Sequence, residues 1–267
     1  MIHTVSGAAV PTLAALPDAL LAEGRSSVTA AEAAGITGKT VVLARQGLQR
    51  LIAAGRVVSP VRGLYVPIAA EYRRWGAPPA LDIVDGMMHH LGRRYYVGLL
   101  SAAELHGAGH QRPQVFQVVV DRQVTDRRIG RSDFRFISST LMATVPVVSR
   151  NSATGSVNVS SPEATMFDLA LRPGAAGGLD NVATIIGELA GEGLVNLTEL
   201  AVAARSFPAS AVRRVGWMLA TFCGIDATAE LATSPADHSR LDPHGDRGGP
   251  IDPTWKLILN ASIEPDL

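Results

Sequence analysis

The sequence predicts an α+β protein, in which an N-terminal winged helix-turn-helix is followed by a larger mixed α+β C-terminal domain. In the first 75 residues, three short runs of helical periodicity precede two β-rich runs that a turn joins. Beyond residue 75, strand patterns give way to a succession of helix patterns without a repeating βαβ unit. The length of 267 residues fits one or two domains, and we expect two, over residues 1–75 and 76–267.

The composition excludes several classes of protein. With 47% hydrophobic and 18% charged residues, the chain can bury a core and is not intrinsically disordered throughout. Its single cysteine, Cys223, excludes a disulfide scaffold and a four-thiolate zinc site, and we expect it to pack as a small apolar residue. No signal peptide and no apolar stretch of membrane-spanning length is apparent, so we expect a cytoplasmic protein that does not associate with a membrane.

The net charge of zero hides an asymmetry between the two parts of the chain. Residues 1–75 contain eight Lys and Arg against four acidic residues, whereas the remainder contains 16 basic and 20 acidic residues. A basic module attracts polyanions, because neutralised phosphates release their counterions. The charge alone leaves two interpretations open, a nucleic-acid-binding module and an ordinary fluctuation in surface charge.

The first two expected helices are short. Leucines recur on one stripe over residues 13–23, and Gly24 follows as a stop signal. Thr29 and Glu32 then fit a capping box, in which the Thr hydroxyl accepts a backbone N–H and Glu reaches back to the cap. We expect this second helix to span barely two turns and to end at Gly35.

The third expected helix, residues 39–54 with Gly55 after it, has one apolar face and one polar face. The apolar face is formed by Val41, Ala44, Leu48, Leu51 and Ile52. A tight turn before a helix with outward cations is typical of the second helix of a helix-turn-helix, which enters the major groove. A solvated surface helix is the alternative. The candidate DNA-binding residues here are Lys39, Thr40, Arg45, Gln46 and Arg50, with Leu43 on the same outward side.

Two β-rich runs follow directly, over residues 56–67. The turn between them contains Arg62 and Gly63. A hairpin in this position corresponds to the wing, and a cation at its tip can reach a phosphate or a minor groove. We therefore add Arg62 and Gly63 to the candidate DNA-binding residues and expect residues 1–75 to form the DNA-binding domain.

Several segments resemble the AbiEi antitoxin family. Residues 48–67, LQRLIAAGRVVSPVRGLYVP, resemble its N-terminal DNA-binding domain, in which the RGLY turn recurs. Residues 95–120 resemble its middle segment, and residues 161–170, SPEATMFDLA, are similar to its Pro-Glu-x-Thr-x-x-Asp-Leu-Ala signature. Residues 213–219 and 241–260 resemble its late helix and final strand, so the likeness covers most of the chain in the expected order.

The resemblance implies a bacterial type IV antitoxin. In such a protein the N-terminal domain represses its own operon by binding inverted repeats in the promoter, and the larger domain, here residues 76–267, counters a neighbouring nucleotidyltransferase toxin. The implied partners are double-stranded DNA and this toxin, without a requirement for a stable complex, and no cofactor is expected. Related proteins also act as stand-alone one-component transcriptional regulators without a toxin, and this alternative stays open.

Elements beyond the first domain follow from periodicity and from turn residues. Pro78 and Pro79 mark the domain boundary and the start of a helix. Helices are expected over residues 80–91, 97–106, 163–171, 182–191, 197–206 and 209–222. Strands are expected over residues 115–120, 134–138, 145–149, 156–159 and 255–259. The tail of residues 233–253 is rich in Pro, Gly and Asp, and we expect an irregular loop there.

The run from Ser161 to Asp168 admits more than one role. Ser161 can cap a helix, Pro162 suits its first turn, and Glu163 opposes the helix dipole. Asp168 can join a buried polar network or pair with an arginine, and a contact surface for the toxin is the alternative. Catalysis would need a partner base or a set of metal ligands, and neither is visible nearby, so we favour a structural role.

Other candidates for metal binding or catalysis fail simple tests. The potential ligand groups are His106 with His110, His89 with His90, and Asp242 with His244 and Asp246. Glycines interrupt the helix between His106 and His110, so the two imidazoles do not share a helix face. His89 and His90 are adjacent and therefore point to different faces, and the Asp242 group sits in a Gly/Pro-rich loop. A nuclease would need an acidic pair followed by Glu-x-Lys, but the only lysines are Lys39 and Lys256. No phosphate-binding loop or nucleophile elbow occurs, so we expect neither a metal site nor an enzyme.

Overall fold

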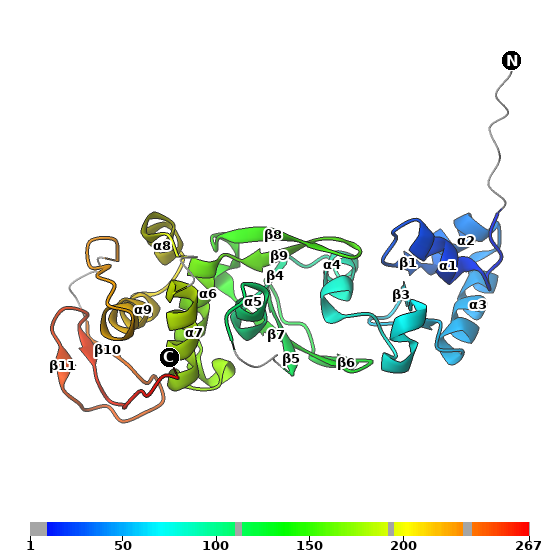
Figure 1. Ribbon diagram of the computed structural model, residues 1–267. Coiled ribbons are helices and arrows are strands. Elements are labelled where there is room, and N and C mark those ends of the chain that lie inside the picture. The colour runs from blue at the N-terminus through cyan, green and yellow to red at the C-terminus, as the bar shows by residue number, and fades with distance from the viewer. Residues whose placement is uncertain (1–9, 110–113, 192–194, 232–236, 267) are drawn as a thin grey trace, which may run out of the picture. The chain divides into compact units, whose positions relative to one another are not determined.

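The computed structural model describes residues 10–109, 114–191, 195–231 and 237–266 (Figure 1). The chain divides into two compact units, which we call the N-terminal and the C-terminal unit. The N-terminal unit comprises Met1–Arg93, Asp126–Phe134 and Arg150–Val157. The C-terminal unit comprises Arg94–Thr125, Arg135–Ser149 and Asn158–Leu267. The first unit thus extends past residue 75, because one further helix and the ends of two hairpins pack with it.

The N-terminal unit combines helices with a small antiparallel sheet. Its helices are α1 Leu16–Ala22, α2 Ala30–Thr37, α3 Val41–Ala53, the 3-10 helix η1 Ala70–Trp75 and α4 Ala80–His90. Its strands β1 Val28–Thr29, β2 Val57–Val58 and β3 Leu64–Pro67 pair in the order β1-β3-β2. Three helices and a hairpin therefore follow one another as the sequence predicts.

The capping box at the start of α2 is present, but the predicted end of this helix is wrong. Thr29 accepts the Glu32 N–H, and the Glu32 carboxylate accepts the Thr29 N–H. Gly35 stays helical, and α2 continues to Thr37. The helix ends at Gly38, whose φ of +63° is the left-handed conformation that a side chain disfavours.

Apolar side chains from the first three helices form the core of the N-terminal unit. This core includes Leu16, Leu20, Leu48 and Leu51, together with Ala33 and Ala44. Gly47 faces the same core, and a Cβ there would lie 2.8 Å from Leu13 Cδ1. The inner face of α3 is thereby fixed, which leaves its opposite face to solvent.

A mixed six-stranded sheet has the order β6-β7-β5-β4-β9-β8. Its strands are β4 Tyr95–Val97, β5 Val115–Val120, β6 Arg127–Ile129, β7 Ser132–Ser138, β8 Val147–Ser152 and β9 Gly155–Ser160. Strand β4 pairs antiparallel with β5 and parallel with β9. The strand expected over residues 115–120 is present with these bounds as β5. The other expected strands are present as β7, β8 and β9 with shifted ends, whereas β4 and β6 were not predicted.

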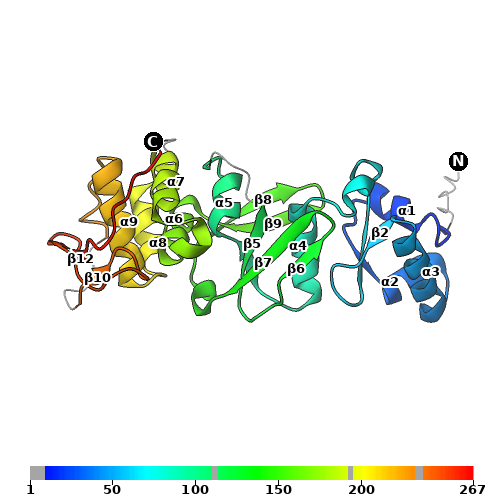
Figure 2. The same cartoon turned by 90° about the horizontal axis from the view of Figure 1, so that it is seen from below.

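The helices expected in the C-terminal unit are present, with corrected starts for α5, α6 and α7. They are α5 Leu99–Leu105, α6 Pro162–Leu171, α7 Leu179–Gly191, α8 Leu197–Ala204 and α9 Ala209–Phe222. Helix α5 begins two residues later than expected, because Val97 belongs to the buried strand β4. Helix α6 packs against α5, α7, α8 and α9 and is buried along almost its whole length (Figure 2).

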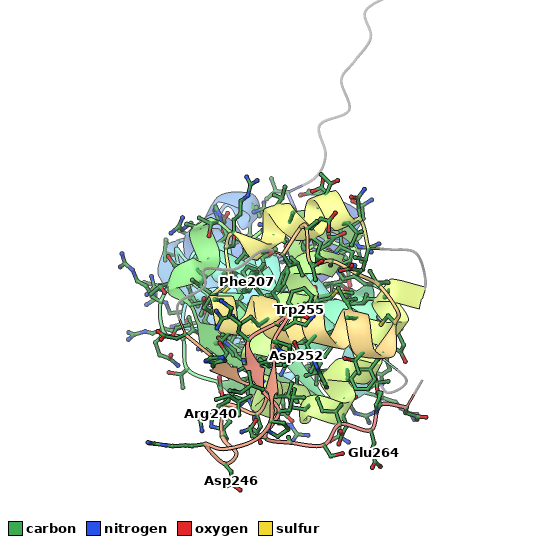
Figure 3. The ribbon with its side chains drawn as sticks, turned by 90° about the vertical axis from the view of Figure 1, so that its left-hand side faces the viewer. Phe207, Arg240, Asp246, Asp252, Trp255 and Glu264 are labelled. Atoms are coloured by element: carbon green, nitrogen blue, oxygen red, sulfur yellow. The ribbon has the colours of Figure 1, made fainter. Side chains whose placement is uncertain are left out.

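The tail was expected to be an irregular loop before a five-residue strand, and this is only partly correct. Within its described residues, short strands β10 Ser239–Arg240, β11 Ile251–Asp252 and β12 Leu257–Ile258 form a small sheet in the order β10-β12-β11. Trp255 packs its indole against Gly216 of α9, where a Cβ would overlap the ring (Figure 3). The final strand is shorter than predicted because the preceding residues turn to place this indole.

The fold class is α+β, as predicted, with the helices α6 to α9 following the strands of the six-stranded sheet in sequence. In the parts of the chain that the structure describes, none of the helices combines the length and the apolar character that a bilayer span requires.

Candidate functional site

The exposed face of α3 is the first candidate site. Arg45, Gln46 and Arg50 are exposed there, as predicted, and Lys39 is exposed just before the helix. Thr40 is the N-cap, and its hydroxyl oxygen accepts the Leu43 N–H over 3.3 Å. The hydroxyl of Thr40 is therefore engaged in starting the helix, while the other four side chains face solvent.

A long stretch of chain around α3 lacks any carboxylate. Between Glu32 and Glu71 the sequence has no acidic residue but five cations, namely Lys39, Arg45, Arg50, Arg56 and Arg62. Arg56 forms an ion pair with Asp18 over 2.7 Å. Among the described residues, the other four cations have no ion-pair partner. Their charge is thus available to a polyanion.

The turn between β2 and β3 is held by contacts within the N-terminal unit. His90 Nε2 of α4 donates to the Arg62 carbonyl over 3.1 Å, and Arg127 Nη1 of β6 donates to the Pro60 carbonyl over 3.1 Å. Gly63 has a φ of +88° and lies half-buried beside His90. The Arg62 side chain is exposed, so this turn presents one cation on a fixed backbone, and Gly63 shapes the turn.

Two exposed positions on α3 were missed by the sequence reasoning. Val42 and Gln49 lie on the outward face with Arg45 and Gln46, at the spacing of three, four and seven residues that shares one helix face. This spacing was itself the signal that could have found them. Val41 was assigned to the buried face but is 43% exposed, because the core ends at Ala44.

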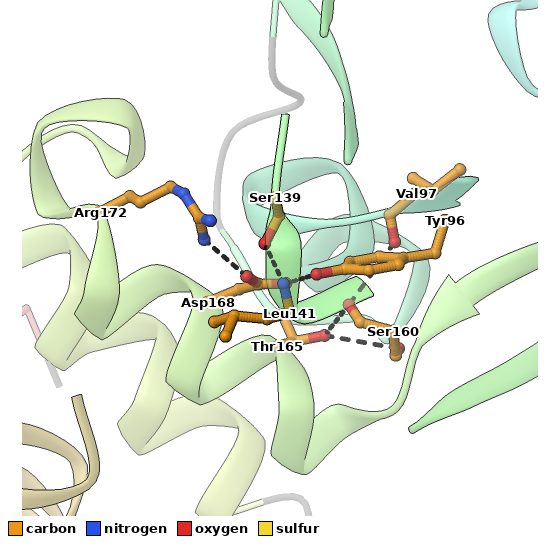
Figure 4. Close-up of polar contacts among 8 residues, drawn as sticks. All are labelled: Tyr96, Val97, Ser139, Leu141, Ser160, Thr165, Asp168 and Arg172. Carbon is orange, nitrogen blue, oxygen red and sulfur yellow. Dashed lines mark hydrogen bonds and ion pairs between the residues drawn. The ribbon is translucent and has the colours of Figure 1, made fainter. Parts of the chain in front are cut away.

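A buried polar cluster in the C-terminal unit contains Asp168. The Tyr96 hydroxyl of β4 donates to Asp168 Oδ2 over 2.8 Å (Figure 4). Arg172 Nη1, from the residue that caps the C-terminal end of α6, donates to Asp168 Oδ1 over 2.8 Å. The Asp168 side chain is only 1% exposed, so its two oxygens depend on these partners.

The electrostatics of this cluster are dominated by burial. Burial raises the pKa of Asp168 to about 6, although the charge of Arg172 and the hydrogen bond from Tyr96 both act to lower it. Burial, followed by the charge of Asp168, raises the pKa of Tyr96 well above its ordinary value. The phenol therefore stays protonated and remains a hydrogen-bond donor.

The rest of the SPEATMFDLA run also holds the fold together. Ser161 caps α6 by accepting the Ala164 N–H over 3.1 Å, and Thr165 bonds the Ser160 hydroxyl over 2.7 Å. The Glu163 carboxylate accepts the Asn196 N–H at the start of α8 over 3.2 Å. These bonds attach α6 to neighbouring elements, which supports the structural role that we favoured for this run.

The potential metal ligands have other tasks in the structure. His106 bonds the Ser160 carbonyl over 2.7 Å, whereas His110 lies outside the described residues. Asp242 accepts the His244 N–H over 2.8 Å within its turn. Cys223 is half-buried at the end of α9, and burial raises the pKa of its thiol. Over residues 10–109, 114–191, 195–231 and 237–266, no group of three or more His, Cys, Asp and Glu could hold a metal ion.

The fold and the site define an α+β protein with a basic helical unit and a second unit that packs around the buried helix α6 and its polar cluster at Asp168. Residues 96–221, which include Tyr96, Asp168 and Arg172, match the AbiEi antitoxin C-terminal domain. The chain therefore carries an antitoxin domain of the AbiEi family, a family of regulators of the toxin–antitoxin type and not of enzymes.

One solved structure supports the fold class. The chain is similar to the RV2827C protein from Mycobacterium tuberculosis, with a TM-score of 0.61 and 18% sequence identity. The likeness covers 94% of this chain and 92% of that chain, and at this identity it concerns the fold alone. No curated protein matches the chain.

Proposed function

We propose that this protein is a type IV antitoxin that counters a nucleotidyltransferase toxin and represses its own operon by binding inverted repeats in the promoter. Residues 1–75 act as a winged helix-turn-helix on DNA, and residues 76–267 act against the toxin. A stable complex with the toxin is not required for this function.

The observation that carries the DNA-binding part is the charge around α3. Five cations and no carboxylate lie between Glu32 and Glu71, and four of these cations are exposed on or beside the outward face of α3 and at the hairpin turn. A helix that follows a short capped helix and a tight turn is suited to the major groove. The hairpin β2–β3 follows α3 directly, which is the position of a wing.

The proposed contacts divide into two kinds. Arg45 and Gln46 project from the outward face of α3 and have the donors that base edges accept. Lys39, Arg50 and Arg62 are placed at its ends and at the turn, where phosphates are the natural partners. Thr40 and Gly63 support this surface through the cap of α3 and the conformation of the turn.

The toxin-directed part is supported by the AbiEi antitoxin domain at residues 96–221. The Asp168 carboxylate is buried and cannot touch a partner, so the surface that counters the toxin lies elsewhere on this unit. A stand-alone transcriptional regulator without a toxin is the alternative, and the growth experiment below separates the two.

Promoter binding is tested with the full-length chain and a labelled duplex from the region upstream of its gene, by fluorescence anisotropy. Arg50→Ala is expected to lower the affinity about tenfold, because one phosphate contact and one positive charge are lost. Arg205→Ala is the matched control, since this exposed arginine lies after α8 in the C-terminal unit. Equal affinity of all three proteins would contradict the proposed DNA surface.

Antitoxicity is tested by growth. The neighbouring nucleotidyltransferase gene is expressed alone, with the full-length chain, and with the full-length Arg45→Ala/Arg50→Ala variant. Point variants are preferable to a cut after residue 75, because the cut would remove the Pro60 carbonyl that Arg127 binds. Rescue by both forms is expected. If the full-length chain does not rescue growth, or if the neighbouring gene is harmless, the protein is a stand-alone regulator.

A further inference from the structure

Three consecutive apolar residues at the start of α3 are exposed to solvent. Val41 is 43% exposed, Val42 is 64% exposed and Leu43 is 49% exposed. Within α3, the first residue that belongs to the core is Ala44, which is fully buried. Exposed apolar residues scattered singly are normal, but three together at the tip of one helix point to a binding surface.

The surroundings of this apolar tip suggest a polyanionic partner. Lys39 precedes it, Arg45 follows it, and no acidic residue occurs in the sequence between Glu32 and Glu71. Val42 also lies on the same outward face as Arg45 and Gln46. These cations and the absence of carboxylates favour DNA as the partner, because its phosphates are negatively charged. An apolar protein surface would gain nothing from them.

The major groove of DNA offers one apolar group to such a tip. Among the four bases, only thymine displays a methyl group in the groove, at its C5 position. In a helix-turn-helix, the residues at the N-terminal end of the second helix are those that reach base edges. Val42 and Leu43 occupy this end of α3, directly after the cap at Thr40.

We infer that Val42 and Leu43 read thymine methyl groups in the major groove, so that the protein selects binding sites with thymine at the bases facing the start of α3. This inference rests on the proposed DNA-binding function and deepens it, since it assigns base selection to apolar residues. The phosphate contacts proposed for Lys39, Arg50 and Arg62 supply affinity for any sequence, whereas the methyl contacts depend on the base.

The test replaces thymine by deoxyuridine, which removes the methyl group and keeps every hydrogen-bonding group. A duplex from the region upstream of the gene is trimmed to its footprint and synthesised once with thymine and once with deoxyuridine. The full-length wild-type chain is expected to bind the deoxyuridine duplex about fourfold more weakly for each methyl group that it buries. Anisotropy titrations at one fixed salt concentration measure both affinities.

Two variants show whether the methyl groups are read by these residues. Leu43→Ala and Val42→Ala are expected to bind the thymine duplex more weakly and to lose most of the difference between the two duplexes. Both side chains are exposed, so the variants should keep the helix content of the wild type, which circular dichroism checks. Arg45→Ala is the matched control on the same helix. It should bind both duplexes more weakly and retain the preference for thymine.

The outcomes are distinct. Equal affinity of the wild type for the two duplexes overturns the methyl-reading inference and leaves the proposed DNA binding intact. A preference that persists unchanged in both apolar variants also overturns it. Failure to bind either duplex overturns the inference together with the proposed function. If Leu43→Ala instead abolishes a dimer seen by sedimentation without altering the preference, the apolar tip is an interface between copies of the chain, and the inference is wrong.

Discussion

The Tyr96 hydroxyl and the Asp168 carboxylate are 2.8 Å apart, and their hydrogen bond joins strand β4 to helix α6 inside the C-terminal unit. Tyr96 is 1% exposed and Asp168 is fully buried, so water can replace neither partner. Arg172 completes the arrangement at the second carboxylate oxygen. A buried carboxylate with one neutral and one charged donor contributes to stability only while both donors are in place.

Removing the phenol oxygen should therefore destabilise the C-terminal unit. In Tyr96→Phe, Asp168 Oδ2 loses its donor, and we expect the free energy of unfolding to fall by about 2 kcal/mol. Urea denaturation followed by circular dichroism measures the change. Tyr72→Phe is the control. Tyr72 is only half-buried, in the N-terminal unit, so this substitution should lower the free energy of unfolding by much less. A Tyr96→Phe variant as stable as the wild type would show that the bond adds nothing.

The pH dependence of stability should carry the signature of Asp168. Its folded-state pKa, about 6, is raised above the ordinary value of 3.8. Between these values the folded chain keeps a proton that the unfolded chain has released. The stabilisation from this site is therefore fully present below pH 3.8 and is lost as the pH rises through 6.

The Asp168→Asn variant isolates this effect, since its side chain does not titrate. The stability of the wild type relative to the variant should decrease by about 1 kcal/mol between about pH 5 and about pH 7. Other titrating groups are common to both proteins and cancel in the difference. Urea denaturation at several pH values gives the difference directly. A constant difference would mean that Asp168 stays ionised over the whole range.

Much of the fold follows from local sequence patterns. The features that were missed depend on contacts between residues that are far apart in the sequence. The bounds of α9 agree with the prediction because apolar residues repeat there over 14 residues. Strand β4 was missed because it has three residues, all buried, and no alternation. The partners Tyr96 and Asp168 are 72 residues apart, so spacing could predict a buried network but not name the tyrosine. The exposed Val42 was missed because the face of a helix depends on where the core stops.

The contact between Gly216 and Trp255 predicts that a glycine inside a helix cannot be replaced. An alanine in a helix interior usually gains about 1 kcal/mol over glycine. In Gly216→Ala, the new Cβ would overlap the indole of Trp255, so we expect a net loss of about 2 kcal/mol instead. Gly35→Ala in α2 is the control, because nothing lies within 4 Å of its Cβ position, and it should be stabilising. Thermal denaturation compares the variants, and a stabilised Gly216→Ala would show that the indole moves away without cost.

DNA binding can be weakened by removing a cation or by removing the support of the β2–β3 turn, and the contact of His90 with this turn allows the two effects to be distinguished. Arg50 is an exposed cation, so Arg50→Ala should lower the affinity for promoter DNA and flatten the dependence of log K on log salt by about one unit. His90 Nε2 instead holds the Arg62 carbonyl over 3.1 Å and positions the turn from behind.

In His90→Ala the turn loses this support, while the lysine and arginine side chains proposed to face DNA all stay in place. We therefore expect a weaker complex with an unchanged salt slope. Anisotropy titrations over a series of salt concentrations measure both quantities for the wild type and the two variants. A flatter slope in His90→Ala would mean that Arg62 leaves the phosphate when the turn is released. An unchanged affinity would mean that the turn does not contribute to the complex, because loss of its anchor then has no effect on binding.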